Sequence, residues 1–439
     1  MTQERRQKID FAFLNAGHFF DHFLILIFAT VAMAIATDRK VAIAGLAVDW
    51  QMTYAELIPF SVAGFAAFGL CSVPAAWIAD KWSRPGMIAI FFFGMGSATM
   101  LASLATSPWY LAAVILVIGV FGAIYHPVGI AMVVQGRSKT GMAIAMNGVF
   151  GNLGVAVAPL ATLLTIEHWG WRAAFFLPGA VCFAVGIAYL VFLRIAHISD
   201  QTYAKKAKPA ADGTLALDRQ VLIRVFSIIL ITAAMGSFIF QSTTFSLPKI
   251  FDERLAGLAT SGKEVGWWAF AVFAAASIAQ LIVGYLVDRH SVRLVFAVVA
   301  GGQAILFAAM LNLTGAPALV VAVMFMLVVF GQIPINDVLI GRIAKSEWRS
   351  RAYSARYIIS FAVMATTVPA ISALHGHWGF HALFAVMSVL AGLIFVAVMF
   401  LPSRSLGRCR GAPEPVVHGP PEAAFRHRHH GDAGVAFSI

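Results

Sequence analysis

The chain has 439 residues, of which 60% are hydrophobic and only 12% are charged. Because charged residues make up about a quarter of an ordinary soluble domain, this composition excludes a soluble multidomain protein, a disordered chain and a secreted disulfide scaffold. The basic excess, 31 Lys and Arg against 20 Asp and Glu, does not require a nucleic-acid partner, since membrane proteins carry such an excess in their cytoplasmic loops.

Apolar runs separated by charged or turn-forming residues predict twelve membrane-spanning helices, because each run is close to the roughly 20 residues that a span needs. The first run is too long, and contains too many polar residues, for a cleaved signal peptide. The sequence therefore predicts an all-α membrane protein with spans at 11–36, 54–79, 86–106, 109–134, 142–166, 173–196, 220–247, 265–287, 292–312, 316–340, 354–375 and 382–402.

Lys and Arg residues fall mostly on one side of these spans. With the N-terminus placed inside, 25 of the 31 lie in inside segments and the other six lie outside. Since basic residues concentrate in cytoplasmic loops, we predict a multi-pass protein of a bacterial-type inner (plasma) membrane with both termini in the cytoplasm.

The two ends of the chain repeat one pattern. Asp80 and Asp288 lie 208 residues apart in similar loops, and His168-Trp169-Gly170-Trp171 recurs 209 residues later as His377-Trp378-Gly379-Phe380. A preference of aromatic residues for membrane interfaces explains each motif singly but not the shared offset. Two parallel six-helix halves are typical of a transporter architecture. The predicted divisions are an N-terminal bundle (1–196), a cytoplasmic linker (197–219), a C-terminal bundle (220–402) and a disordered cytoplasmic tail (403–439).

The segment Gly284-Tyr285-Leu286-Val287-Asp288-Arg289-His290-Ser291-Val292-Arg293 resembles the loop signature of the major facilitator superfamily. The first copy, from Ala76 to Arg84, departs from it where Ala76 and Ser83 replace glycines. Within the superfamily, His18-Phe19-Phe20-Asp21 and Tyr125-His126-Pro127-Val128-Gly129 look like the fosmidomycin-resistance-type efflux branch. The resemblance covers about residues 10–402, and it implies two rocking six-helix bundles and a transporter rather than an enzyme.

The two loop copies provide candidate gating residues at the cytoplasmic helix ends. A carboxylate there can cap the following helix and pair with a basic residue of a neighbouring helix, which would lock one conformation. The alternative is a solvated topology signal without a gating role. The candidates are Asp80, Arg84, Asp288, Arg289 and Arg293.

The first span carries ionisable residues at membrane depth, where such groups are costly and are functional candidates. His18, Asp21 and His22 are spaced i, i+3 and i+4 and so share one helix face. At 1.5 Å per residue, Asp21 lies roughly 15 Å and His126 roughly 14 Å above the cytoplasmic side. The resemblance places helices one, four, seven and ten around the cavity, and it therefore implies that the two residues face each other. Pro127 loosens the helix behind His126. We predict that Asp21 carries a proton and that His18, His22 and His126 relay or tune it.

Other interpretations of this polar face stay open. Asp21 could be a permanent partner of a histidine that holds helices together, and each histidine could be an ordinary packing residue. The residue types of His18, Asp21 and His22 also suit a transition metal, but no second cluster of His or Cys supports that hypothesis. We therefore predict neither a metal nor another cofactor.

A central cavity is expected between the two halves. Adding 210 to His126 leads to Asn336, which places polar residues at a corresponding depth in the second half. Arg356 could pair with Asp337 as an inner gate, bind an anionic substrate or extend to the interface. The candidate cavity residues are Asn15, Tyr125, Gln241, Gln332, Asn336, Asp337 and Arg356.

The expected function is proton-coupled export of a small, partly apolar compound. Gly148, Gly151 and Gly154 with Pro159 are similar to a glycine-rich motif with proline that antiporters of the superfamily carry, and this resemblance favours export. No Gly-Lys-Ser/Thr phosphate loop is present to use ATP. The alternatives are proton-coupled uptake of an organic anion, with Arg356 or Lys249 as its partner, and a transport-inactive receptor or scaffold. The expected partners are a small-molecule substrate, protons and the lipid bilayer, with no nucleic acid, and we expect a monomer.

Overall fold

The computed structural model describes residues 2–43, 50–135, 140–196, 218–343 and 349–402. Within these ranges the chain is helical, and no strand occurs. The helices are α1 (Gln3–Ile35), α2 (Tyr54–Leu57), η1 (Ile58–Ser61), α3 (Val62–Lys81), α4 (Arg84–Ala102), α5 (Pro108–Gly122), η2 (Tyr125–Gly129), α6 (Ile130–Val134), α7 (Thr140–Ile195), α8 (Arg219–Arg254), α9 (Gly262–Arg289), α10 (Val292–Ala309), α11 (Gly315–Ile343) and α12 (Arg349–Met399). The predicted linker, except its last two residues, and the predicted tail lie outside the described residues.

In the described chain, ten helical stretches are long and apolar enough to cross a membrane. Two of them, α7 with 56 residues and α12 with 51, are each long enough for two crossings. The ten stretches therefore accommodate the twelve predicted spans. The predicted pairs of helices at 142–166 and 173–196, and at 354–375 and 382–402, correspond to α7 and α12, in each of which two helices join directly at a kink.

Single glycines turn the chain where the two helices of each pair meet. Gly170 has φ 79° and ψ 169°, and Gly379 has φ 65° and ψ −169°. This backbone region is accessible almost only to glycine. Both glycines belong to the repeated His-Trp-Gly motif, so the repeat preserves a bend at the same place in each half.

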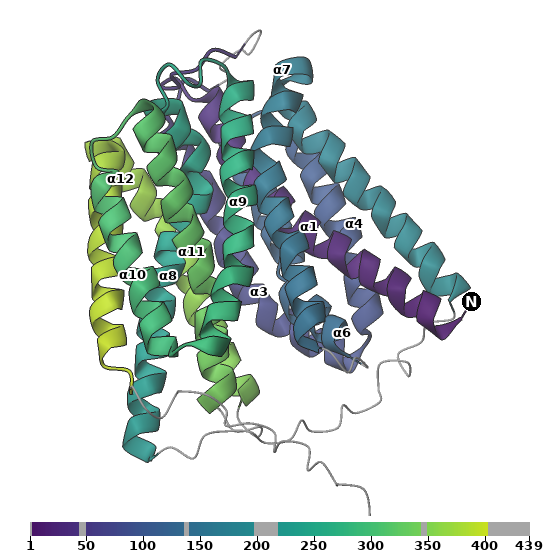
Figure 1. Ribbon diagram of the computed structural model, residues 1–439. Helices are drawn as coiled ribbons and strands as arrows, with labels where there is room; N and C mark the ends of the chain where they lie inside the picture. Colours follow the sequence, from purple (N-terminus) through teal and green to yellow (C-terminus); the bar gives the residue numbers. More distant parts are fainter. Residues whose placement is uncertain (1, 44–49, 136–139, 197–217, 344–348, 403–439) are drawn as a thin grey trace, which may run out of the picture.

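Figure 1 shows the helices of the first half, coloured purple to blue, beside those of the second half, coloured teal to yellow. The two groups meet where α7 packs on α9 and where α12 packs on α3. Helix α1 lies inside the bundle, since 83% of its most apolar stretch is buried. For the span that contains α3, the corresponding share is 28%. Large apolar side chains such as Leu70, Trp109 and Ile305 are exposed on the outer surface of the bundle, as expected for a surface that contacts lipid.

The end of the bundle at which α1 finishes is here called the outer end, following the orientation predicted from the basic residues. There the segment after α1 crosses to the second half. Ala42 forms a bridge with Ser261, in which Ala42 N donates to Thr260 O and Gly262 N donates to Ala42 O, at 3.3 and 3.2 Å. The two halves are therefore joined by backbone contacts at this end.

Candidate functional site

The polar face of α1 lies in the interior of the first half. Asp21 is 1% exposed and His18 is 7% exposed, while His22 is half-buried. Their i, i+3, i+4 spacing directs the three side chains to one side of the helix, as the sequence predicts. This side of α1 packs against α7 and against the short helix η2.

Helix η2 brings His126 to Asp21. The five residues Tyr125–Gly129, with Pro127 among them, form a π-helical turn between α5 and α6, and such turns are frequent at functional sites. His126 Nε2 lies 3.3 Å from Asp21 Oδ2. The His126 ring also lies edge-on to the rings of His18 and His22, at centroid distances of 5.3 and 5.4 Å. The structure thus brings together the four residues predicted to handle the proton.

Asn147 on α7, which is not among the residues predicted from the sequence, fixes one side of this cluster. Its backbone carbonyl accepts a hydrogen bond of 2.8 Å from His18 Nδ1. Its amide nitrogen donates to Asn15 Oδ1 at 3.0 Å and to the Tyr125 hydroxyl at 2.9 Å, and that hydroxyl donates to the Leu14 carbonyl. Asn15 and Tyr125, predicted to line the cavity, therefore belong to a buried network that joins α1, η2 and α7. An amide inside an apolar helix was the only signal for Asn147.

A cavity of about 260 Å³ lies between the halves and reaches this cluster. His126 forms part of its wall, whereas Asp21 lies behind His126 and is closed off from solvent. From the second half, Tyr357 and Phe361 of α12 complete the wall, and Phe361 packs on both Phe68 and His126. The full lining is Ser72, Val73, Ala76, His126, Pro127, Ile130, Ala131, Tyr357, Ile358 and Phe361.

The cavity residues predicted in the second half lie in polar contacts away from this lining. Gln332 Oε1 accepts a hydrogen bond of 2.7 Å from Gln303, and Asn336 Oδ1 accepts one of 3.2 Å from Thr232. Arg356 donates to the carboxylate of Asp337, so the two residues pair across α11 and α12. Gln241 is buried in α8. These contacts form within the second half and do not join it to the first.

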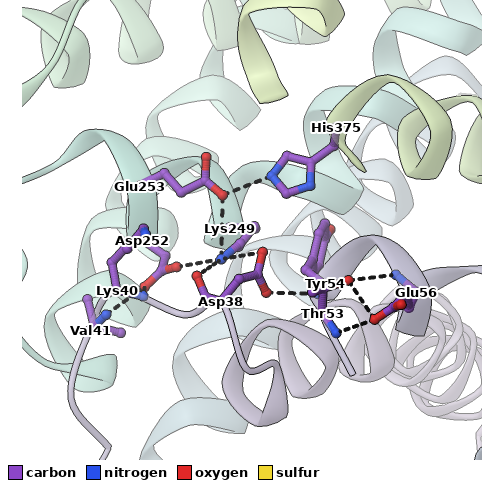
Figure 2. Close-up of polar contacts among 10 residues, drawn as sticks. All are labelled: Asp38, Lys40, Val41, Thr53, Tyr54, Glu56, Lys249, Asp252, Glu253 and His375. Atoms are coloured by element: carbon purple, nitrogen blue, oxygen red, sulfur yellow. Dashed lines mark hydrogen bonds and ion pairs between the residues drawn. The ribbon is translucent and has the colours of Figure 1, made fainter. Parts of the chain in front are cut away.

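A different ion-pair cluster joins the two halves at the outer end, and Figure 2 shows its members. Lys249 of α8 is completely buried. Its ammonium lies 2.9 Å from Asp252, 3.4 Å from Glu253 and 3.5 Å from the carboxylate of Asp38, and it donates to the Asp38 carbonyl at 2.8 Å. Asp38 belongs to the segment after α1, so Lys249 connects both halves. We call Asp38, Lys249, Asp252, Glu253 and His375 the outer clasp.

Further contacts surround the outer clasp. The second oxygen of Asp252 accepts hydrogen bonds from the backbone of Lys40 and Val41, at 2.8 and 2.7 Å. Glu253 also lies 2.8 Å from His375 of α12 (Figure 2). Asp38 accepts from the backbone N–H of Tyr54, whose ring lies beside the His375 ring. From the sequence, Lys249 is expected only as a partner for an anionic substrate, and the four other members are not among the predicted site residues.

The predicted gating loops form contacts inside each half. Asp80 lies 2.8 Å from Arg84, which also donates to Gln135 at 3.1 Å. Asp288 lies 3.7 Å from Arg342. The expected capping by these aspartates differs from the structure, because each is still in the last turn of α3 or α9, and the hydroxyl of Ser83 caps α4 instead. Arg289 stacks on Tyr285, and Arg293 lines a surface groove beside α10.

Two groups of described residues have ligand atoms close enough for a metal ion. These atoms lie within 4.8 Å of one another in His18, His22 and His126, and in Asp38, Glu253 and His375. In each group an imidazole already contacts a carboxylate, Asp21 in the first and Glu253 in the second. Internal contacts account for both groups, and we assign neither to a metal.

The fold and these sites define a multi-pass α-helical membrane protein with two helical halves around a cavity. A family model of the Major Facilitator Superfamily matches residues 11–262 and 254–430. The chain therefore belongs to the Major Facilitator Superfamily, and the resemblance seen in its loop signature is confirmed. It is a transporter and not an enzyme.

Two curated relatives align with parts of the chain. The Multidrug resistance protein MdtG of Yersinia enterocolitica is 27% identical over 118 residues, which are 27% of this chain and 28% of that protein. The Niacin transporter NiaP of Acinetobacter baylyi is 28% identical over 133 residues, 30% of each chain. The matches thus span less than a third of either relative.

Solved structures share the fold over nearly the whole chain. A POT family transporter in complex with 5-aminolevulinic acid has a TM-score of 0.68 at 13% identity, covering 91% of this chain and 96% of that one. A bacterial homologue of the human lysosomal transporter Spinster, in an inward-facing and occupied conformation, has a TM-score of 0.65 at 14% identity, covering 91% and 95%. At these identities the likeness concerns the fold alone.

Proposed function

We propose that this protein is a proton-coupled secondary transporter of a bacterial-type inner membrane, and that it exports a small, partly apolar compound by alternating access. Asp21 carries the proton, while His18, His22 and His126 relay or tune it. The observation that carries the proposal is the contact of 3.3 Å between the buried carboxylate of Asp21 and His126, whose ring lines the cavity. A carboxyl group whose access to water changes through the cycle can take up a proton on one side and release it on the other.

The cavity supports a partly apolar substrate. Its described lining contains no aspartate, glutamate, lysine or arginine, and most of its side chains are aliphatic or aromatic. Apolar pockets with a few polar groups hold ligands mainly by burial, and the polar groups set orientation. In this cavity Ser72, His126 and Tyr357 supply those polar groups.

The resemblance to an efflux branch and the partial similarity to a multidrug resistance protein support export. The cationic side chains that an imported anion would use are already paired, Lys249 with the carboxylates of the outer clasp and Arg356 with Asp337. The partial similarity to a niacin transporter favours anion uptake as the second candidate function. We further propose that both termini are cytoplasmic, that the protein acts as a monomer, and that it binds no nucleic acid.

The test uses inverted membrane vesicles with an imposed pH gradient and a panel of neutral aromatic drugs together with niacin. We expect gradient-driven accumulation of at least one neutral compound inside these vesicles, and loss of that accumulation in Asp21→Asn. Because asparagine cannot take up or release a proton, accumulation in this variant should not exceed the level measured without a pH gradient. The matched control is Glu4→Gln, which removes an exposed carboxylate from the same helix.

The other outcomes separate the alternatives. Gradient-driven movement of niacin in the opposite direction would identify an importer of organic anions. Full activity of Asp21→Asn under a pH gradient would disprove the assignment of the proton to Asp21. Binding of a panel compound without any transport would indicate a receptor or scaffold.

A further inference from the structure

His375 occupies a buried position in the outer clasp, at the opposite end of the molecule from the cytoplasmic loops. Only 9% of the residue is exposed. Its Nε2 lies 2.8 Å from Glu253 Oε1, and its ring contacts the rings of Tyr54 and Phe380, at centroid distances of 5.5 and 4.5 Å. The other ring nitrogen, Nδ1, is buried and has no hydrogen-bond partner. The transport mechanism proposed above makes no use of this histidine.

The charged and titratable groups that face His375 come from three segments. Helix α8 provides Lys249, Asp252 and Glu253, the segment after α1 provides Asp38, and α2 provides the phenol of Tyr54. The part of the clasp in the second half therefore contains one ammonium and two carboxylates. With a neutral imidazole it carries one net negative charge, and it faces the negative charge of Asp38 in the first half.

A proton on His375 changes this balance between the halves. The second half of the clasp becomes neutral overall, and its net repulsion of Asp38 disappears, while the close contact between Lys249 and Asp38 remains. The ligand atoms of Asp38, Glu253 and His375 lie within 4.8 Å of one another. Like charges at this distance in a poorly solvated site repel each other strongly. Protonation therefore favours the conformation in which the two halves are closed together at the outer end.

We propose that the outer clasp is a second proton site, at which protonation of His375 closes the outer end of the transporter. Histidine suits this role because its charge changes within the physiological pH range. The closed state is favoured at low external pH and is lost as the pH rises. This inference rests on the proposed function, because it adds a second proton-linked step to the same cycle. In an exporter, protons arriving from outside would drive the return to the inward-facing state.

The experiment measures the separation of the two halves at the outer end as a function of pH. Spin labels are placed on Thr106→Cys in the first half and Thr314→Cys in the second, both exposed positions. The native cysteines, Cys71, Cys182 and Cys409, are replaced by alanine. Pulsed electron–electron double resonance on the full-length protein in nanodiscs then gives the populations of short and long distances between the two labels at pH values from 5 to 8.

We expect the short distance to gain population as the pH falls, with the closed-to-open ratio changing by up to about tenfold per pH unit, the limit for a transition linked to one proton. The variant His375→Gln should remove this pH dependence. The variant Glu253→Gln removes one negative charge from the second half and should remain closed at all pH values. The matched control is His377→Gln, which replaces an exposed histidine of the same helix and should behave as the wild type.

Several results would overturn the proposal. They are a distance distribution that does not respond to pH in the wild type, a response of opposite sign, and a response that persists in both His375→Gln and Glu253→Gln. The variant Asp21→Asn separates this proposal from the proposed function. If it loses transport but keeps the pH response at the outer end, the two proton sites are distinct. If it loses the pH response, the response belongs to Asp21, and the assignment to His375 is wrong.

Discussion

The Asp21 cluster and the outer clasp differ in how they relate to the two halves of the molecule. The Asp21 cluster is built by α1, η2 and α7, all from the first half. The outer clasp takes Asp38 from the first half and its other members from the second. When the halves rock, contacts inside one half persist, whereas contacts between halves must separate. The Asp21 cluster, which lies within one half, is therefore suited to keep a charge through the transport cycle. The outer clasp, which connects the halves, is suited to control the opening of the outer end.

The two regions also differ in how well their charges are compensated. Neither oxygen of the buried Asp21 carboxylate has a hydrogen-bond partner, although His126 is near. In contrast, Lys249 has oxygen atoms from three acidic residues within 3.5 Å. A buried charge without full compensation is costly, and a change of protonation relieves that cost. A fully surrounded lysine instead keeps its charge and holds its partners in place.

The largest effect that separates the two regions is expected from Lys249→Met. The substitution leaves the carboxylates of the outer clasp buried without their cation, and breaking a buried pair in this way costs about 3–5 kcal/mol. We expect the outer end to open, with a large fall in the population of the short distance between labels at Thr106→Cys and Thr314→Cys. The cluster around Asp21 should keep its structure, since it makes no contact with the clasp.

Two further variants test this interpretation. Lys263→Met removes an exposed lysine at the same end and should leave the distance unchanged. Adding Asp252→Asn to Lys249→Met removes one uncompensated charge and should restore part of the closed population. An outer end that stays closed in Lys249→Met would contradict the role of the clasp.

A smaller effect, confined to the first half, is expected from Gly151→Ala. The added Cβ would lie 2.7 Å from His18 Nε2, and the ring is held on its other side by the Asn147 carbonyl. Forcing the imidazole to move costs about 1–3 kcal/mol. We expect slower gradient-driven transport and a lower melting temperature, with no change in the distance at the outer end.

Gly148 provides the matched control for this substitution. It lies three residues earlier on α7, and a Cβ at this position meets nothing within 4 Å. Gly148→Ala should therefore stabilise the helix by about 0.5–1 kcal/mol and leave transport unchanged. Equal effects of the two substitutions would show that His18 packing does not depend on this glycine.

Most of the helical fold follows from local properties of the chain. An apolar run of sufficient length forms a spanning helix wherever it lies in the sequence, and the predicted spans coincide closely with the observed helices. What the sequence does not predict is the conformation of the chain at Gly170 and Gly379, where two helices meet without a loop. A helix can turn at one glycine without a loop, and composition does not distinguish the two cases.

The candidate sites were predictable to different extents. Spacing along α1 and depth in the membrane placed Asp21 and His126 at the same height, because both quantities depend on helix geometry alone. The outer clasp depends on how the halves pack, and Asp38, Lys249 and His375 come from distant parts of the chain. In the sequence they look like ordinary charges near helix ends. No local pattern indicates that such charges converge.

The smallest effect on the outer end and on stability is expected from Asp80→Asn. This variant removes an ion pair with Arg84 inside one half, whereas the outer clasp connects the two halves. The Asp80 side chain is 64% exposed, and its partner Arg84 keeps a second hydrogen bond to Gln135. Exposed pairs of this kind contribute about 0–1 kcal/mol. In the conformation of this structure, we therefore expect no change in the distance between labels at Thr106→Cys and Thr314→Cys. The melting temperature should stay close to that of the wild type. A marked loss of transport with unchanged stability would show instead that Asp80 forms a contact between the halves in another state of the cycle, as the gating hypothesis from the sequence requires.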